Sequence, residues 1–223
     1  MRGCERQPEL PACRTLIERT ESAFGSIYAV FANAGYGIEG DVVSLSERDF
    51  RAMLETNFFG TMYTVMPAIE RMRAAGRGHV LICASVVSKM GIPTMSAYSA
   101  SKALQDHVGR ALRIELDGRV HVSTVHPVGT ETEFSGRVER LSGRPRTARS
   151  PARIRQTPER VARAIVDCLH DPRGEVWTSW IGRMTAAVAV AAPELADRVL
   201  RKRFPAHQPP SPLAPWDGAG PPR

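Results

Sequence analysis

The sequence predicts an α/β protein built on a parallel sheet. Short apolar segments such as "IYAVFAN", "HVLICAS" and "VHVSTVHP" alternate with longer amphipathic stretches. Apolar runs of this kind are typical of strands that are buried on both faces, and strands that alternate with helices favour a parallel sheet with right-handed crossovers. The length of 223 residues and the hydrophobic content of 43% fit a single domain, and no internal repeat is visible.

The individual elements follow from apolar periodicity and from residues that start or end helices. Gly25, Gly76 and Gly118 are expected to end helices, whereas Ser46 and Pro158 are expected near helix starts. The expected helices cover residues 12–24, 46–76, 96–116, 158–170 and 183–203. The expected strands cover residues 27–35, 79–85, 120–129 and 175–180. The domain should therefore extend over residues 1–203, and the proline- and glycine-rich tail at 204–223 should be disordered.

The composition argues against several other classes of protein. The four cysteines form no C-x-x-C pair and have no histidines at zinc-ligand spacing, so we expect reduced thiols in a cytoplasmic protein and no metal site. The polar N-terminus resembles no signal peptide, and no apolar run approaches the roughly 20 residues of a transmembrane helix. The net charge of +7 comes mainly from arginines, many of them at 135–156. One interpretation of these arginines is a surface that binds nucleic acid. We favour the alternative, a solvated loop with no nucleic-acid partner, because no aromatic residues alternate with these arginines.

A G-x-G-x-x-G pattern occurs at residues 35–40, directly after the first expected strand. A dinucleotide-binding loop of this kind is followed at once by a helix, whose N-terminus holds the pyrophosphate. Here "DVVSLS" follows, and no helix is expected before Ser46. The acidic residue at the usual distance, Glu55, falls inside a helix instead of at a strand end. We therefore interpret the pattern as a coincidental match. The small residues of "NAG" just before it would let the backbone approach a ligand closely.

Tyr98 and Lys102 lie four residues apart on an expected helix and so share one face. A nearby ammonium favours the phenolate and should lower the tyrosine pKa, which makes the pair a plausible acid/base unit. The alternative is that Tyr98 packs in the core and Lys102 is solvated.

Two further polar residues are candidates for the same site. Ser85 ends a strand at the edge of the sheet where ligands bind, and its hydroxyl could hold a carbonyl oxygen or merely cap a turn. Asn57 lies in a long helical stretch, where asparagine is unfavourable. It could cause a kink through a local hydrogen bond, or it could anchor a water molecule behind Lys102.

In their order and spacing, these residues resemble the short-chain dehydrogenases/reductases. The matching segments are "NAG" at 33–35, Asn57 in "ETNFFGT", Ser85 in "ICAS", "YSASK" at 98–102 and the turn "HPVGTET". The resemblance covers about residues 10–180 and implies a Rossmann-like, doubly wound parallel sheet. It also implies an oxidoreductase that interconverts an alcohol and a carbonyl by hydride transfer with NAD or NADP, the choice being open. The catalytic residues would be Asn57, Ser85, Tyr98 and Lys102.

The same resemblance implies which residues contact the cofactor. These are Ala32, Asn33, Ala34, Gly35, Tyr98, Lys102, Pro127, Val128, Gly129, Thr130 and Thr132. Two positions depart mildly from the family pattern, since Ala32 replaces an asparagine and Val128 separates the proline from Gly129.

A larger departure concerns the first part of the family fold. The first strands of the family and its T-G-x-x-x-G-x-G loop have no counterpart in these 223 residues. We therefore expect an N-terminally truncated domain with an open sheet edge. A catalytically inactive fragment that binds or pairs with a partner is the alternative to an enzyme. We expect a small-molecule substrate covered by the segment at 135–156, and a homo-oligomer in which "WTSWIGRM" and the last helix form the subunit contact. Contact with a membrane surface is the alternative for that segment.

Overall fold

Four parallel strands form one sheet, in the order in which they occur along the chain. The computed structural model describes residues 10–116, 118–143, 145–147 and 150–204. The strands are β1 (Ala29–Ala32), β2 (His79–Cys83), β3 (His121–His126) and β4 (Glu175–Trp177), in the order β1-β2-β3-β4. Ala29 is paired with His79 and His79 with His121, so the strands run in register and their carboxyl ends meet at one edge. The predicted parallel α/β sheet is confirmed.

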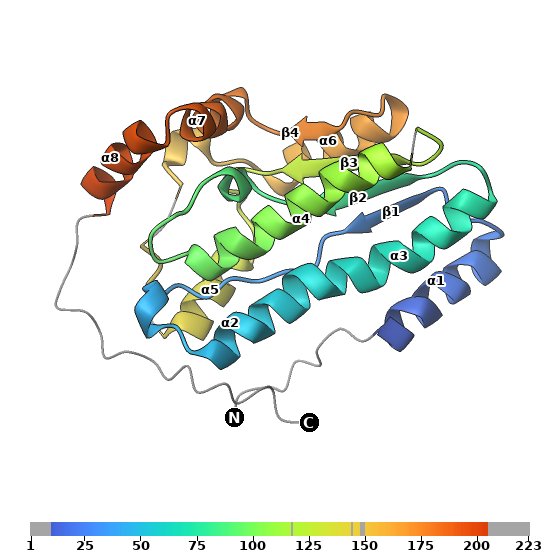
Figure 1. Ribbon diagram of the computed structural model, residues 1–223, viewed down its shortest axis with the longest axis horizontal. Coiled ribbons are helices and arrows are strands. Elements are labelled where there is room, and N and C mark those ends of the chain that lie inside the picture. The colour runs from blue at the N-terminus through green and yellow to red at the C-terminus, as the bar shows by residue number, and fades with distance from the viewer. Residues whose placement is uncertain (1–9, 117, 144, 148–149, 205–223) are drawn as a thin grey trace.

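Helices cover both faces of this sheet, as expected for a doubly wound fold (Figure 1). The helices α3 (Gly60–Ala74) and α4 (Ser96–Glu115) pack on one face, and α1 (Leu10–Phe24) lies beside α3. Val80 and Ile82 point into the core on this side. Leu81 points to the opposite side, where it packs with residues of α6 (Pro158–His170). Strand residues thus alternate between two cores, which explains why β2 is apolar throughout.

Most helix boundaries are where the sequence placed them. The Ser46 hydroxyl accepts a hydrogen bond from the Asp49 amide and caps α2 (Glu47–Leu54). Thr157 caps α6 in the same way, and Pro158 occupies its first turn. Gly25 and Gly76 have positive φ angles at the ends of α1 and α3. The predicted helix over 46–76 is continuous, but a π-helical turn at Glu55–Phe59 separates α2 from α3.

Two expectations about the second half of the chain were wrong. The predicted last helix at 183–203 is two helices, α7 (Trp180–Ala191) and α8 (Pro193–Arg203), because Pro193 cannot donate the hydrogen bond that would continue α7. The arginine-rich segment at 135–156 is not simply a loop. Its first part forms α5 (Phe134–Ser142), which ends at Gly143 in a left-handed conformation. The predicted disordered tail lies, from residue 205 onwards, outside the described residues.

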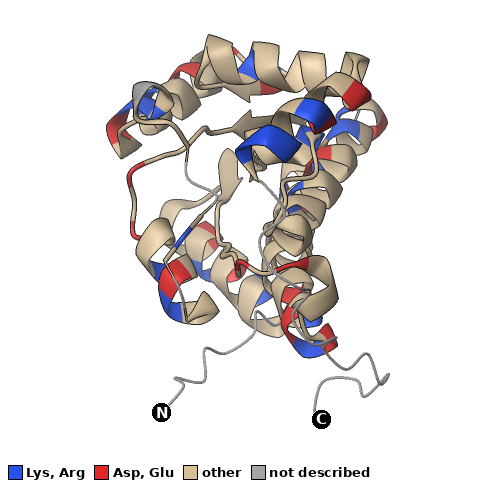
Figure 2. Cartoon of the chain, turned by 90° about the vertical axis from the view of Figure 1, so that its left-hand side faces the viewer, with Lys and Arg blue, Asp and Glu red and all other residues tan. Residues whose placement is uncertain are grey.

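The described side chains bear on the cysteine and charge interpretations. Cys13, Cys83 and Cys168 are free thiols. None of the helices in the described part of the chain combines the length and apolar character that a membrane span requires. In the view of Figure 2, basic and acidic residues are interspersed on the same helices.

One buried histidine gives the fold a predictable pH dependence. The side chain of His79 is fully buried, and its Nε2 lies 2.7 Å from the hydroxyl oxygen of Ser123. Because that hydroxyl donates to the Arg173 carbonyl, Nε2 must be the protonated nitrogen, and Nδ1 has no partner among the described residues. Burial, followed by the nearby His121, lowers the pKa of His79 to about 4.

We predict that the free energy of unfolding is constant near pH 7 and falls as the pH drops from 6.5 towards 4. In this window the unfolded chain takes up a proton that His79 does not bind in the folded state, which lowers the free energy of unfolding by about 3 kcal/mol at pH 4. Urea unfolding across this range measures the effect. The change H79Q, which keeps a donor for Ser123 but cannot titrate, should remove this part of the slope; an unchanged slope in H79Q would contradict the assignment.

Candidate active site

The candidate site lies at the carboxyl ends of β1, β2 and β3, where the first turns of α4 and α5 also meet (Figure 1). In parallel sheets this edge is the usual place for ligands. Tyr98 and Lys102 come from α4, one turn apart, and Ser85 follows β2. The Tyr98 ring packs against Phe134 of α5, with 5.2 Å between ring centroids. The fold therefore brings residues from three separate segments to this edge.

Lys102 is buried, contrary to the alternative of a solvated side chain. Its Nζ donates a 2.6 Å hydrogen bond to the Cys83 carbonyl oxygen at the end of β2, and it lies 5.8 Å from the centroid of the Tyr98 ring. Burial lowers the pKa of Lys102, and the Cys83 thiol partly opposes this. The position of the ammonium is thus fixed by the strand end.

The expected lowering of the Tyr98 pKa was wrong for the protein alone. Burial raises the pKa of Tyr98 and the Cys83 thiol adds to this, while the positive charge of Arg146 and a hydrogen bond with the Ser85 side chain oppose it. The desolvation of the phenolate therefore outweighs the favourable charges.

Ser85 takes one of the two roles that the sequence left open, the capping of a turn. Its hydroxyl accepts a 3.4 Å hydrogen bond from the Val87 amide and caps the 3-10 turn η3 (Val86–Lys89). The same side chain is close enough to Tyr98 to oppose the rise of its pKa.

Asn57 is fully buried and connects three segments of the chain. Its Oδ1 accepts from the Tyr36 amide, and its Nδ2 donates to the Tyr36 carbonyl and to the Ser101 hydroxyl, all at 2.9 Å. The π-helical turn frees the Asn57 carbonyl to accept from Gln105 Nε2 at 2.7 Å. The side chain therefore holds the loop after β1 against α4, one residue before Lys102.

Two glycines of residues 35–40, Gly35 and Gly37, are explained by close packing. A Cβ atom at Gly35 would lie 3.1 Å from Asn57 Oδ1 and 3.4 Å from Lys102 Nζ, and one at Gly37 would lie 3.2 Å from Phe134. A short 3-10 turn, Val42–Ser44, follows the pattern, whereas the next α-helix, α2, begins only at Glu47. Glu55 lies in the π-helical turn, again as expected.

The turn after β3 contributes the remaining predicted residues. The Pro127 carbonyl accepts from the Val86 amide, while Val128 is buried against Gly182 of α7. Gly129 has a φ of 44°, which explains its identity. The buried Thr130 hydroxyl has no hydrogen-bond partner in the described structure, and Thr132 is exposed beside Phe134. At the end of β1, Ala32 is buried, whereas Asn33 and Ala34 are exposed.

Sequence reasoning missed the residues that cover Tyr98. The Arg146 guanidinium lies over the Phe134 ring at 5.3 Å, and the buried Glu39 accepts hydrogen bonds from the Thr147 amide and the Thr94 hydroxyl. Glu39 thus attaches the arginine-rich segment to the loop after β1. A buried acid in a segment of small residues was the only available signal.

A second polar cluster behind Ser85 was also missed. Asp106, His126 and Glu175 offer ligand atoms within 4.8 Å of one another, close enough to hold a metal ion. However, the Lys89 ammonium lies 2.6 Å from Asp106 and 3.1 Å from Glu175. A side-chain cation therefore takes the place between the two carboxylates. Asp106 follows Lys102 by one helical turn, which could have drawn attention to it.

Comparison with known proteins agrees with this description. A family model described as short chain dehydrogenase matches residues 9–141. The NADP-dependent (R)-specific alcohol dehydrogenase of Lentilactobacillus kefiri is 31% identical over 140 residues, which cover 59% of this chain and 56% of that protein. The 11-beta-hydroxysteroid dehydrogenase A of Arachis hypogaea is also 31% identical over 140 residues, covering 60% of this chain and 38% of that protein. The chain spans about half the length of such curated relatives.

Solved structures show the same fold. An alcohol dehydrogenase of the archaeon Thermococcus sibiricus, complexed with 5-hydroxy-NADP, superposes with a TM-score of 0.63 at 24% identity, covering 77% of this chain and 71% of that one. A short-chain dehydrogenase of Streptomyces avermitilis superposes with a TM-score of 0.70 at 17% identity, covering 91% of this chain and 79% of that one.

The fold and the site together define a Rossmann-like α/β protein with a polar site at the carboxyl ends of its strands. The matching family model covers more than half of the sequence. The chain belongs to the short-chain dehydrogenase family.

We predict that N57A lowers the free energy of unfolding by about 2–4 kcal/mol. The change leaves the buried amide and carbonyl of Tyr36 and the Ser101 hydroxyl without this partner. Urea unfolding measures the loss. As a control, T64V removes a hydroxyl that bonds only within α3 and to the Cys13 sulfur, and should cost less than about 1 kcal/mol. Equal losses in both variants would contradict the connecting role of Asn57.

Proposed function

We propose that the protein is an NAD(P)-dependent oxidoreductase that interconverts an alcohol and a carbonyl. The observation that carries the proposal is the buried Lys102, whose ammonium lies 5.8 Å from the centroid of the Tyr98 ring on the same face of α4, with Ser85 close enough to influence the Tyr98 pKa. A phenol and a serine hydroxyl placed together can hold one substrate oxygen and exchange a proton with it.

Each of the four polar residues has a role in this proposal. Tyr98 gives a proton to the substrate oxygen or takes one from it, and Ser85 holds that oxygen. Lys102 keeps a positive charge near the site and favours the phenolate when Tyr98 loses its proton. Asn57 fixes the loop after β1 and α4 relative to each other.

The residues around the site fit the nicotinamide half of the cofactor. The buried Thr130 hydroxyl is available as a hydrogen-bonding group, and the loop of Gly35 approaches Lys102 closely. Together with Tyr98, Lys102 and Thr132 these residues would hold that half, whose nicotinamide supplies or accepts the hydride. We assign no residue of the chain to the pyrophosphate. The choice between NAD and NADP stays open.

The relatives support this reading at the level of reaction class. Those named above are an alcohol dehydrogenase described as NADP-dependent and a hydroxysteroid dehydrogenase. A small alcohol or carbonyl compound is the corresponding substrate. We further propose that the segment from Phe134 to Gln156 covers it, because Phe134 packs on Tyr98 and Arg146 lies over Phe134.

We predict that Y98F abolishes turnover, lowering kcat at least about 1000-fold, while cofactor affinity changes less than about threefold. The phenyl ring keeps the packing against Phe134 but cannot transfer a proton. The measurements are the absorbance of the reduced cofactor with a panel of alcohols and ketones, and cofactor binding by calorimetry. The assay uses the protein encoded by the whole open reading frame that contains this chain.

The control is Y28F, because Tyr28 is half exposed and comes directly before β1, away from Tyr98. It should keep wild-type turnover. Activity that survives Y98F would refute the role of Tyr98. Cofactor binding with no turnover on any substrate in the wild type would favour a non-catalytic binding protein.

We also propose a homo-oligomer whose subunits meet through α7. Trp180, Met184 and Val188 follow one another at helical spacing and are 74%, 54% and 46% exposed. A stripe of large apolar side chains is typical of an interface. A cytoplasmic location is our remaining proposal, supported by the three free thiols.

We predict that M184K together with V188K lowers the oligomeric state measured by analytical ultracentrifugation, because two charges would be buried in the contact. The control is the double variant R183K and R198K, which keeps the charge and should leave the mass of the oligomer unchanged. A wild-type protein that is monomeric at micromolar concentration, or an oligomer that both charge-introducing changes leave intact, would contradict this contact.

A further inference from the structure

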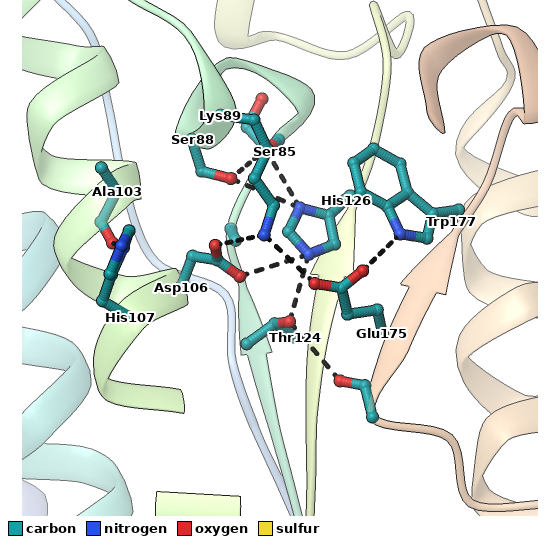
Figure 3. Close-up of polar contacts among 12 residues, drawn as sticks. Ser85, Ser88, Lys89, Ala103, Asp106, His107, Thr124, His126, Glu175 and Trp177 are labelled. Carbon is teal, nitrogen blue, oxygen red and sulfur yellow. Dashed lines mark hydrogen bonds and ion pairs between the residues drawn. The ribbon is translucent and has the colours of Figure 1, made fainter. Parts of the chain in front are cut away.

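The cluster behind Ser85 is built around His126, the last residue of β3 (Figure 3). Its ring is fully buried and stacks on the Trp177 ring, with 4.3 Å between centroids and 11° between planes. The ring Nδ1 lies 3.1 Å from the Ser85 carbonyl oxygen, and Nε2 lies 3.5 Å from Asp106 Oδ1. Both ring nitrogens therefore point at oxygens that can only accept hydrogen bonds.

These contacts define the neutral state of the ring. A carbonyl cannot donate, so Nδ1 carries the proton and donates to Ser85. The Ser85 carbonyl also accepts from the Ser88 hydroxyl at 2.7 Å. Nε2 then has a lone pair, to which the Thr124 hydroxyl can donate at 3.1 Å. In this state Nδ1, the Ser88 hydroxyl and the Thr124 hydroxyl each have a hydrogen-bond acceptor. The exception is the lone pair of Nε2, which also faces Asp106 Oδ1.

A second proton would rearrange the cluster without a large movement. Nε2–H would face Asp106 Oδ1, and the Thr124 hydroxyl could turn to its other acceptor, the Gly174 carbonyl at 3.5 Å. The ring would then be a second cation next to Lys89, which is bound to the same Asp106 and to Glu175. Lys89 is the last residue of the turn η3, which Ser85 caps. The Nδ1–H bond to the Ser85 carbonyl is unchanged by this second proton, so His126 holds Ser85 in either state.

All charged groups that face His126 belong to this cluster. They are Asp106 from α4, Lys89 from η3 and Glu175 from β4, with the Trp177 indole donating to Glu175 at 2.8 Å. Burial lowers the pKa of His126, and the Ser85 carbonyl, Asp106 and Glu175 partly oppose this. The pKa of Glu175 is lowered, since the hydrogen bonds from Trp177 and Lys89 outweigh its burial.

We propose that His126 is a positioning residue that holds Ser85 against Tyr98 through the Ser85 backbone. This inference rests on the proposed oxidoreductase function. It makes the Lys89 and Asp106 pair, which lies next to the His126 ring, part of the support for the site.

Three substitutions test the proposal in the protein expressed from its whole reading frame. H126F keeps a ring on Trp177 but removes both hydrogen bonds, and kcat should fall about tenfold with little change in KM. H126N keeps a side-chain donor for the Ser85 carbonyl but cannot titrate. Its kcat should stay within about threefold of the wild type, because the hydrogen bond to the Ser85 carbonyl is kept. H121N, at the exposed start of the same strand, is the control and should change neither quantity.

Rescue by H126N separates positioning from a merely structural role. The asparagine keeps a donor for the Ser85 carbonyl, which H126F lacks. A loss of kcat in H126N as large as that in H126F would overturn the proposal.

A measurement that does not need turnover keeps this test independent of the proposed reaction. The amides of Val87 and Ser88 donate to Ser85, and their hydrogen exchange should accelerate at least about tenfold in H126F but not in H126N. Absence of turnover in every variant together with this difference in exchange would refute only the reaction. Unchanged exchange and unchanged kcat in H126F would refute the positioning role.

Discussion

The hydrogen bonds of the buried Asn57 side chain are the constraint on which the site depends. They join the loop after β1 to α4 through Tyr36 and Ser101. Because Gly35 comes within contact distance of both Asn57 and Lys102, the position of the loop also limits where the ammonium can lie. The π-helical turn that carries Asn57 is thus part of the site rather than an irregularity of the helix.

The arrangement of the polar groups explains why backbone atoms matter as much as side chains here. Lys102 is held by the carbonyl of Cys83, Asn57 by the backbone of Tyr36, and His126 by the carbonyl of Ser85. Each of these backbone groups lies at the end of a strand or soon after it. The edge of a parallel sheet therefore offers free polar groups to whichever side chains reach it.

The sequence was sufficient to predict the sheet, most helix boundaries and the main polar residues of the site. Apolar runs and capping residues are local signals, so β2 and the start of α2 could be placed from them. The Tyr98 pKa could not be predicted, because it depends on how deeply the ring is buried against Phe134. The second cluster was missed for a similar reason. Lys89, Asp106 and Glu175 are far apart in the chain and look like ordinary surface charges until the fold buries them together.

The order of the strands has a consequence for how the chain can fold. Every strand pair joins consecutive strands, and their partners, such as Ala29 with His79 or His79 with His121, are roughly 40 to 50 residues apart. Each of the strands β1 to β4 can pair with a strand that is its neighbour in the chain as well as in the sheet. The described sheet can therefore grow by adding one strand and its preceding helix at a time, in the direction of synthesis. The edge that carries the polar groups would be extended with each step.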